Sequence, residues 1–237
     1  MWFLNQRGFI IKLLDRIAWN VAKVSRLTFW YLTTRVNVRV LTALYVFTAI
    51  VVSIAIMGVA AYFTSWVFVF PSIGPSAFLI FYAPSSAMSA PRNTILGHLA
   101  GVFLGYASYK VALLLGVAKG STLMFATSGI AMGFLGMLMV LTGILHPPAA
   151  SSCLIASLGF VKGMYQILGM MGAVVVMCVQ GYVMNNLVGI KYPLWSPMED
   201  MPLPKIKTVL GDVSELQAKD HVESIAAKLA MRQKIDE

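Results

Sequence analysis

The chain has 237 residues, of which 59% are hydrophobic, and a mean hydropathy of +0.79; these values exclude an ordinary soluble domain. The formal net charge of +9 would suit a nucleic-acid-binding protein, but most of the excess lies in residues 1–39, beside the first apolar run. Basic flanks of this kind are typical of membrane spans, so we predict a membrane protein that binds no nucleic acid.

Residues 1–39 are predicted to form a basic amphipathic helix on the membrane surface. Apolar positions such as Phe9, Leu13 and Ile17 recur at helical steps, with tryptophan and phenylalanine interleaved. Such a helix buries its apolar face in the bilayer and directs its basic side chains to anionic lipid headgroups. We expect the segment to be retained, because its basic region is too long for a signal peptide.

Residues 40–190 are predicted to form an all-α membrane domain, a polytopic helix bundle. Four apolar runs, at 40–63, 93–117, 121–145 and 163–189, are long enough to cross a bilayer. Between them lie two shorter apolar pieces, at 71–83 and 147–160. These are too short for standard spans and are predicted to be half-helices or re-entrant segments buried within protein.

The number of crossings is open at this point. Four full spans, with both short pieces dipping in and out from one side, leave both termini in the cytoplasm, and six crossings give the same parity. We prefer four spans, because Lys110 and Lys119 then flank a cytoplasmic loop. The expected location is a bacterial inner membrane.

The central part of the chain contains no acidic residue from Arg16 to Met198. Ionisable groups inside a membrane are costly and usually functional. A carboxylate-free core cannot use Asp or Glu to bind protons, Na⁺ or metals, and it suits an anion better. Cys153 and Cys178 stand in apolar surroundings and are interpreted as packing residues. We therefore expect no metal, no cofactor and no enzymatic activity.

The two short pieces both open with proline, small and hydroxyl residues. The candidate binding positions at these entrances are Ser72, Gly74, Ser76, His146, Ser151 and Ser152. The repetition suggests two related halves, and short interrupted segments at corresponding positions point to the binding site of a transporter. The free amides at the start of a half-helix can hold an anion. Alternatively, the prolines only bend helices and the serines bond to backbone carbonyls.

Arg92 and two histidines are further candidates. Arg92 begins a predicted span, where its guanidinium either holds an oxyanion or extends to a lipid headgroup. His98 follows within the same span, and His146 begins the second short piece. Each histidine either completes a structural hydrogen bond or carries a proton.

Small and amide residues indicate how the spans pack. Two sets of glycines recur at helical spacing: Gly97, Gly101 and Gly105 on one span, and Gly129, Gly133 and Gly136 on the next. Both sets predict close contact between neighbouring helices. Asn185 and Asn186, near the end of the last span, are expected to bond across helices or to line a pathway.

Residues 191–237 form a tail of different character, rich in proline and then in charge. A helix is predicted at 212–234, with apolar residues roughly on one face. It either docks on a partner or on the membrane domain, or it is solvated.

Several motifs together resemble the HPP family of integral membrane proteins. They are His146-Pro147-Pro148, Pro91-Arg92-Asn93, Gly97-His98-Leu99 and Asn185-Asn186-Leu187. The resemblance covers roughly residues 40–190 and implies a four-span membrane protein, with a branch of the family implicated in nitrite transport. The chain departs from the common pattern at Ala149-Ala150, where glycines are frequent.

The function expected from these observations is transport or channelling of a small inorganic anion such as nitrite. Backbone amides and hydroxyls would bind the anion, Arg92 would attract it, and His98 or His146 would couple protons. The alternative is a non-transporting accessory or assembly subunit of a larger membrane complex. We expect either a homo-oligomer or a subunit of such a complex.

Overall fold

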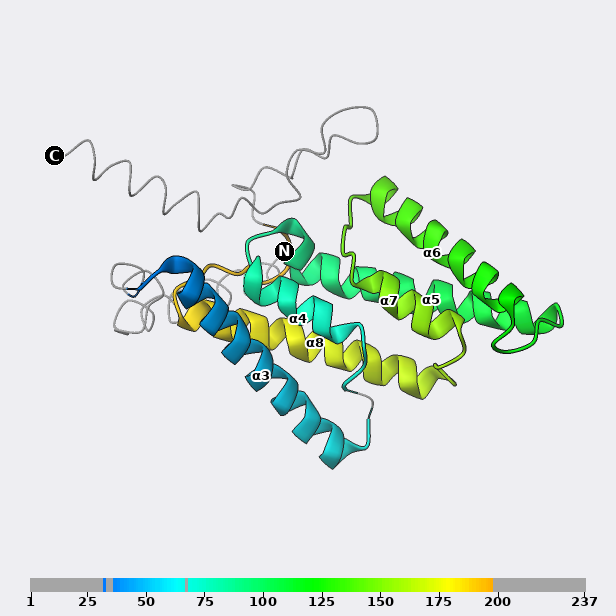
Figure 1. The fold of residues 1–237 in the computed structure, drawn as a ribbon, viewed down its shortest axis with the longest axis horizontal. Helices are drawn as coiled ribbons and strands as arrows, with labels where there is room; N and C mark the ends of the chain where they lie inside the picture. Colours follow the sequence, from blue (N-terminus) through cyan, green and yellow to red (C-terminus); the bar gives the residue numbers. More distant parts are fainter. Residues whose placement is uncertain (1–31, 33–35, 67, 198–237) are drawn as a thin grey trace, which may run out of the picture.

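The computed structural model of the chain describes residue 32 and residues 36–66 and 68–197, and every regular element within these ranges is helical (Figure 1). In chain order the elements are α3 (Val38–Thr64), α4 (Ile73–Tyr82), the 3-10 helix η1 (Ala87–Ser89), α5 (Pro91–Leu114), α6 (Thr122–Thr142), α7 (Ala149–Ser157) and α8 (Met164–Leu187). The predicted all-helical fold is confirmed for this part of the chain. The surface helix predicted within 1–39 lies almost wholly outside the described residues, and the helix predicted at 212–234 lies entirely outside them.

Three of the described helices, α3, α6 and α8, are long and apolar enough to cross a membrane. The fourth long helix, α5, is as long as α8, at 24 residues. Its first turns, however, carry polar side chains, among them Asn93, Thr94 and His98. These three side chains are buried. Helix α5 packs against α6, α7 and α8, so its polar residues face protein at the centre of the bundle.

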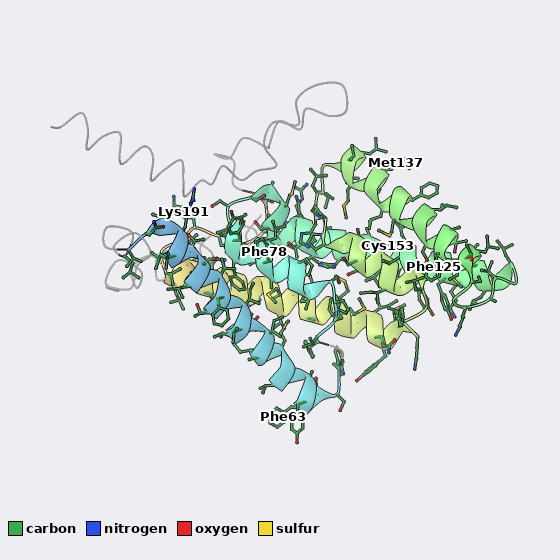
Figure 2. The ribbon with its side chains drawn as sticks, in the orientation of Figure 1. Phe63, Phe78, Phe125, Met137, Cys153 and Lys191 are labelled. Carbon is green, nitrogen blue, oxygen red and sulfur yellow. The ribbon has the colours of Figure 1, made fainter. Side chains whose placement is uncertain are left out.

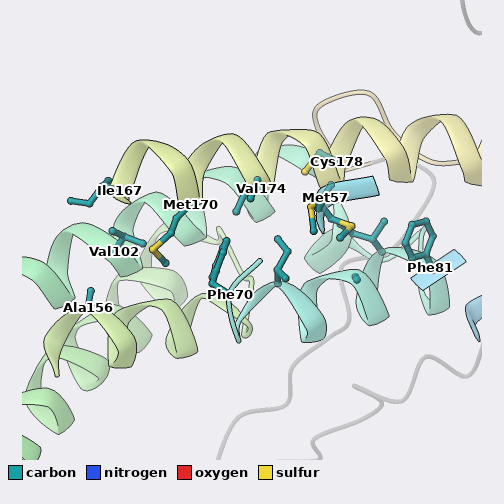
Figure 3. Close-up of a cluster of buried hydrophobic side chains, with 14 of the residues drawn as sticks. Met57, Phe70, Phe81, Val102, Ala156, Ile167, Met170, Val174 and Cys178 are labelled. Atoms are coloured by element: carbon teal, nitrogen blue, oxygen red, sulfur yellow. The ribbon is translucent and has the colours of Figure 1, made fainter. Parts of the chain in front are cut away.

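The outer surface of the bundle is apolar. Large hydrophobic side chains such as Phe63, Phe125 and Met137 are exposed and point away from the bundle (Figure 2). The interior core, in contrast, runs along α8 from Ile167 to Cys178 (Figure 3). An exposed apolar surface around a core with buried polar groups is the arrangement expected of a protein in lipid.

The glycines of α5 allow α7 to approach closely. A Cβ at Gly101 would stand 2.5 Å from the Ala149 carbonyl oxygen, and one at Gly105 would collide with the carbonyl oxygen of Cys153. Close packing through this set is therefore confirmed. The second predicted set, on α6, behaves differently, since a Cβ at Gly133 or its two partners would meet no described atom within 4 Å.

The first short segment runs the length of α8. The ring of Trp66 packs at 5.4 Å on that of Tyr165, at the start of α8. The segment then passes Gly172, and it ends near the last turns of α8, where Asn185 Nδ2 donates to the Ile80 carbonyl at 3.2 Å. The predicted short piece and the described residues that lead into it therefore do not dip in and out from one side. They follow α8 from one end to the other and are helical from Ile73 to Tyr82.

The second short segment follows α5 in the same way. His146 and Ala149 lie against Gly97, near the start of α5, and Gly159 lies against the ring of Tyr109, near its end. Helix α7 therefore runs parallel to α5 along most of its length. Of the two forms predicted for the short pieces, the structure contains half-helices.

The described chain consists of two halves of similar make-up, each with a long helix, a short-helix segment and a second long helix. Helix α6 runs antiparallel to α5, because Ser108 donates to the Thr127 carbonyl near one end and Leu135 lies against Gly101 nearer the other. With three segments in each half and a reversal at every turn, the second half runs in the opposite direction to the first. The related halves that the sequence suggested are thus arranged as an inverted repeat.

The predicted count of four full spans is not confirmed, because three of the described helices are long and apolar enough to cross a membrane. Six segments of the described chain run along the bundle, so the loop between α5 and α6 lies at the end opposite to the start of α3 and the end of α8. Lys110 and Lys119 border that loop, where their ammonium groups stand 5.3 Å and 5.5 Å from the rings of Tyr106 and Tyr109. Each of the two positive charges therefore interacts with a nearby aromatic ring. The lysines do not place this loop at the end of the bundle where α3 starts.

Candidate functional site

Five of the eight predicted site residues meet in one buried cluster. Ser72 and Ser76 come from the start of α4, His98 from α5, and His146 and Ser152 from the segment that contains α7. Each of these five residues is 0% exposed. The starts of the two short helices, which belong to opposite halves of the chain, therefore converge on the same histidine of α5.

Ser76 joins the two imidazole rings. Its Oγ lies 2.8 Å from His98 Nε2 and 3.1 Å from His146 Nε2, and these two nitrogens are 3.2 Å apart. The Ser76 hydroxyl is also 3.1 Å from the Ser72 carbonyl oxygen, to which it donates. Helical spacing explains the pairing, because residues at i and i+4 share a face, as Ser72 and Ser76 do at the start of α4.

Two further hydroxyls extend the cluster on the far side of His98. Ser152 Oγ lies 2.7 Å from His98 Nδ1, and Ser72 Oγ lies 2.6 Å from Ser152 Oγ. The Phe70 ring packs against the His98 imidazole in a T-shaped arrangement, with the two ring centroids 6.3 Å apart and the ring planes at 87°. Both nitrogens of His98 therefore have hydrogen-bond partners, and an apolar ring packs against the imidazole.

A backbone carbonyl determines the tautomer of His146. Its Nδ1 lies 2.7 Å from the carbonyl oxygen of Met88, which can only accept, so Nδ1 carries the hydrogen. In the neutral ring, Nε2 is then a lone-pair acceptor. His98 must present an N–H at its own Nε2, since otherwise two lone pairs would face each other at 3.2 Å.

These two assignments fix the remaining hydrogens of the cluster. His98 Nε2–H donates to Ser76 Oγ, and His146 Nε2 lies within hydrogen-bonding distance of the same N–H. Ser152 donates to His98 Nδ1, and Ser72 donates to Ser152. Every N–H and O–H of the five side chains is then used within the protein. Among the ring nitrogens, only the lone pair at His146 Nε2 is then partly used.

A second layer of polar groups supports His146 from the η1 side. Thr94 Oγ1 stands 3.4 Å from both His146 Nδ1 and the Ser89 carbonyl oxygen, and the Tyr192 hydroxyl donates to the same carbonyl at 2.7 Å. Burial, together with the neighbouring Cys178 thiol, raises the pKa of Tyr192 well above its usual range, so the phenol remains a donor. Our sequence analysis missed Thr94, although it precedes His98 by one helical turn and so shares its face.

Three predicted site residues lie outside the cluster. Gly74 is half-buried, and a Cβ there would meet no described atom within 4 Å. Ser151 is half-buried beside Ser152, and the Arg92 amide, at the start of α5, donates to the Trp195 carbonyl. The backbone of Arg92 therefore lies at the end of the bundle that carries Trp195.

The expected free amides at the start of α7 are already occupied. The N–H groups of Ala149, Ala150 and Ser151 donate to the carbonyls three residues earlier, at 3.0 to 3.1 Å. In α4, Pro75 has no N–H, and the Ile73 amide donates to the Phe70 carbonyl. At the start of α7, side-chain hydroxyls and imidazoles, rather than backbone amides, are therefore the groups with which this site can bind a ligand.

Comparison with known proteins gives one decisive result. The sequence model described as the HPP transmembrane region matches residues 34–193, which include every residue of the cluster. The chain belongs to the HPP family. A transmembrane protein of Dictyostelium discoideum is 31% identical over 129 residues, which cover 52% of this chain and 44% of that protein. The chain therefore matches less than half of the length of this relative, and no solved structure matches it.

A second polar contact within the HPP domain joins three helices near the end of α8. Asn185, 0% exposed, accepts from the Tyr45 hydroxyl of α3 at 2.7 Å and donates to the carbonyls of Ile80 and Gly181. Asn186 bonds to the Tyr182 carbonyl within its own helix. Of the two roles expected for these amides, Asn185 has the bonding role across helices.

Proposed function

We propose that the HPP domain carries a small inorganic anion, nitrite or a close analogue, across a membrane. The observation that supports this is the convergence of two half-helical segments, from oppositely directed halves, on one buried cluster of hydroxyls and imidazoles. Broken helices that meet between inverted repeats are typical binding sites of secondary transporters. The sequence between residues 16 and 198 has no carboxylate, which favours an anion over a cation as the ligand.

In this proposal, the cluster holds the anion and the ends of the bundle collect it. Ser72, Ser76 and Ser152 supply hydroxyls, and His98 and His146 supply imidazoles. Arg92, at the start of α5, attracts anions from the water on that side. The chain acts without a cofactor or metal and catalyses no reaction.

The proposed orientation follows from the basic N-terminal segment. The start of α3 and the end of α8 share one end of the bundle, and residues 1–39 carry most of the excess positive charge. By the positive-inside rule, we place this end in the cytoplasm, with the N-terminal basic residues on anionic headgroups. A bacterial inner membrane fits this orientation.

Uptake into vesicles tests the proposal. Purified protein in proteoliposomes should take up nitrite, and nitrate or formate to differing extents, faster than protein-free vesicles do. Ser76→Ala removes the hydroxyl between the two imidazoles and should abolish most of this uptake, whereas Ser151→Ala, a serine on the same helix as Ser152 but outside the cluster, should retain it. Uptake of all three anions at the rate of protein-free vesicles would contradict the proposal.

The α6 surface favours a second candidate, an accessory subunit of a larger membrane complex. The glycines at 129, 133 and 136 form a face that the described residues leave uncovered, although such faces usually contact another helix. Purification in mild detergent without overproduction separates the two candidates. A stoichiometric partner would favour the accessory role, and a homo-oligomer that takes up anions would favour the transporter.

A further inference from the structure

We infer that the cluster binds its anion only together with a proton, so that the HPP domain carries the equivalent of a neutral acid. This inference rests on the proposed function and adds a coupling rule to it. The proton is added to the lone pair of His146 Nε2, and it leaves from the same nitrogen when the anion leaves. No other bond forms or breaks.

The side chains of the neutral cluster have no spare donor. The hydrogens of Ser72, Ser152 and His98 are used in one chain of bonds, and Ser76 donates to the Ser72 carbonyl. An anion needs N–H or O–H groups directed at it. To bind an anion in this state, the cluster would have to break bonds between fully buried groups.

One added proton creates the missing donor at a defined atom, His146 Nε2. The Met88 carbonyl holds the Nδ1 hydrogen of His146 at 2.7 Å, so the ring can gain a hydrogen only at Nε2. Two N–H groups, from His146 and His98, then point into the same space across 3.2 Å. The Ser76 oxygen can accept from both, but a neutral hydroxyl does not balance a buried positive charge.

Within the part of the chain that the structure describes, no group balances that charge. The elements packed around the pair contribute hydroxyls from α4 and α7, Thr94 from α5, a carbonyl from η1 and the ring of Phe70. The phenol of Tyr192, next to Cys178, bonds at Ser89 and not at the imidazoles. The described residues include no carboxylate, and the nearest formal charge along α5 is the cation Arg92.

The bound proton favours binding of the anion, and the bound anion favours binding of the proton. The starts of α4 and α7 both lie at the cluster, and the positive end of a helix dipole disfavours a cation and favours an anion. A proton that binds alone therefore leaves a positive charge that nothing in the described site balances. An anion that binds alone finds no free side-chain donor. Linkage requires that whichever binds first raises the affinity for the other.

Calorimetry of the purified protein tests the coupling without any transport. Nitrite and nitrate are titrated into the detergent-solubilised chain in buffers of equal pH and different ionisation enthalpy. We expect about one proton to be taken up per bound anion, and an affinity that falls about tenfold per pH unit on the alkaline side. Anion binding with no proton uptake and no pH dependence would overturn the inference.

The variants locate the proton. His146→Asn keeps an N–H for the Met88 carbonyl but has no group that titrates, so the proton uptake and the pH dependence should both disappear, with weaker binding at low pH. Cys153→Ala removes a titratable thiol next to Ser152 and outside the cluster, and it should leave the proton count unchanged. If His146→Asn does not fold, the proton count of the unmodified protein still decides the question.

Vesicles with a trapped pH indicator separate the failure of this inference from that of the proposed function. Nitrate uptake should be accompanied by acidification of the interior, should be driven by an inward proton gradient, and should be insensitive to an imposed potassium diffusion potential. Nitrate uptake that follows the membrane potential without acidification would leave anion transport intact and reject the coupling. Absence of any anion binding or uptake would reject both.

Discussion

His98 and His146 come from opposite halves of the chain, and their Nε2 atoms lie 3.2 Å apart. The ring centroids are 4.9 Å apart and the ring planes are inclined at 59°, so the contact is made through the nitrogens and not by stacking. A carbonyl of η1 holds one ring and two serines hold the other. The pair is therefore placed by four segments, namely α4, η1, α5 and the α7 segment, and any relative movement of the two halves must change it.

Removing the Ser152 hydroxyl should destabilise the fold and impair anion binding. Its oxygen is the shared partner of His98 Nδ1 and the Ser72 hydroxyl, and Ser152→Ala leaves both groups buried without that partner. We expect a loss of about 1–3 kcal/mol in the free energy of unfolding. Thermal unfolding in detergent measures this loss. Ser151→Ala, at the half-buried neighbour, should change little, and equal losses in the two variants would show that the hydroxyl bond is not the cause.

Adding one methyl group at Gly105 should also weaken the fold. The new Cβ would collide with the carbonyl oxygen of Cys153, and this oxygen belongs to the backbone of α7, which cannot rotate away. Overpacking of this kind costs about 1–3 kcal/mol, so Gly105→Ala should lower the thermal midpoint. Gly133→Ala, where the methyl group meets no described atom, should leave the midpoint unchanged or raise it, because alanine favours helix by about 1 kcal/mol. If both variants unfold at the temperature of the parent protein, α7 does not pack on α5 as described.

The long helices could be predicted from the sequence because apolar runs bounded by basic residues or glycine have little choice of structure in lipid. The runs predicted at 40–63 and 163–189 correspond to α3 (Val38–Thr64) and α8 (Met164–Leu187). The direction of the short segments could not be predicted, because a half-helix with an extended lead can either return to its own side or continue. Its contacts with distant residues decide this, as the edge-to-face contact of Trp66 with Tyr165 shows.

The membership of the cluster was partly predictable, and helix periodicity explains which choices were right. Ser72 and Ser76 are separated by about one turn and share a face, while Gly74 lies between them and faces elsewhere. On α5, Thr94 is one turn before His98 and faces His146, whereas Arg92 is not at a helical repeat from His98. Choosing residues by motif included Arg92 and missed Thr94. The tautomer of His146 depends on a carbonyl far away in sequence, which no local pattern indicates.

The amide of Asn185 should be more important for stability than that of its neighbour. Asn185 bonds to α3 and α4 as well as to its own helix, while the amide nitrogen of Asn186 bonds within α8. Asn185→Ala removes the hydrogen bonds that join α8 to the half-buried Tyr45 hydroxyl and to the Ile80 carbonyl, at an expected cost of about 1–3 kcal/mol in the free energy of unfolding. Asn186→Ala should cost clearly less. Thermal unfolding of the two variants in the same detergent compares them, and a larger loss for Asn186→Ala would contradict this contact.

Arg92 should affect the collection of anions and not their binding in the cluster. It lies half-buried at the start of α5, at the end of the bundle that carries Trp195, so its charge acts on anions approaching from water. Arg92→Gln should slow nitrate uptake from that side at low ionic strength, and the difference from the parent should shrink in high salt, because about 0.1 M salt screens charges beyond roughly 10 Å. The proton count per bound anion should stay the same.

Lys162→Gln removes an exposed cation at the opposite end of the bundle and serves as the control for net charge. A deficit in Arg92→Gln that persists at every salt concentration, with lower thermal stability, would instead indicate that the guanidinium anchors α5 at a lipid headgroup, the other role that the sequence left open.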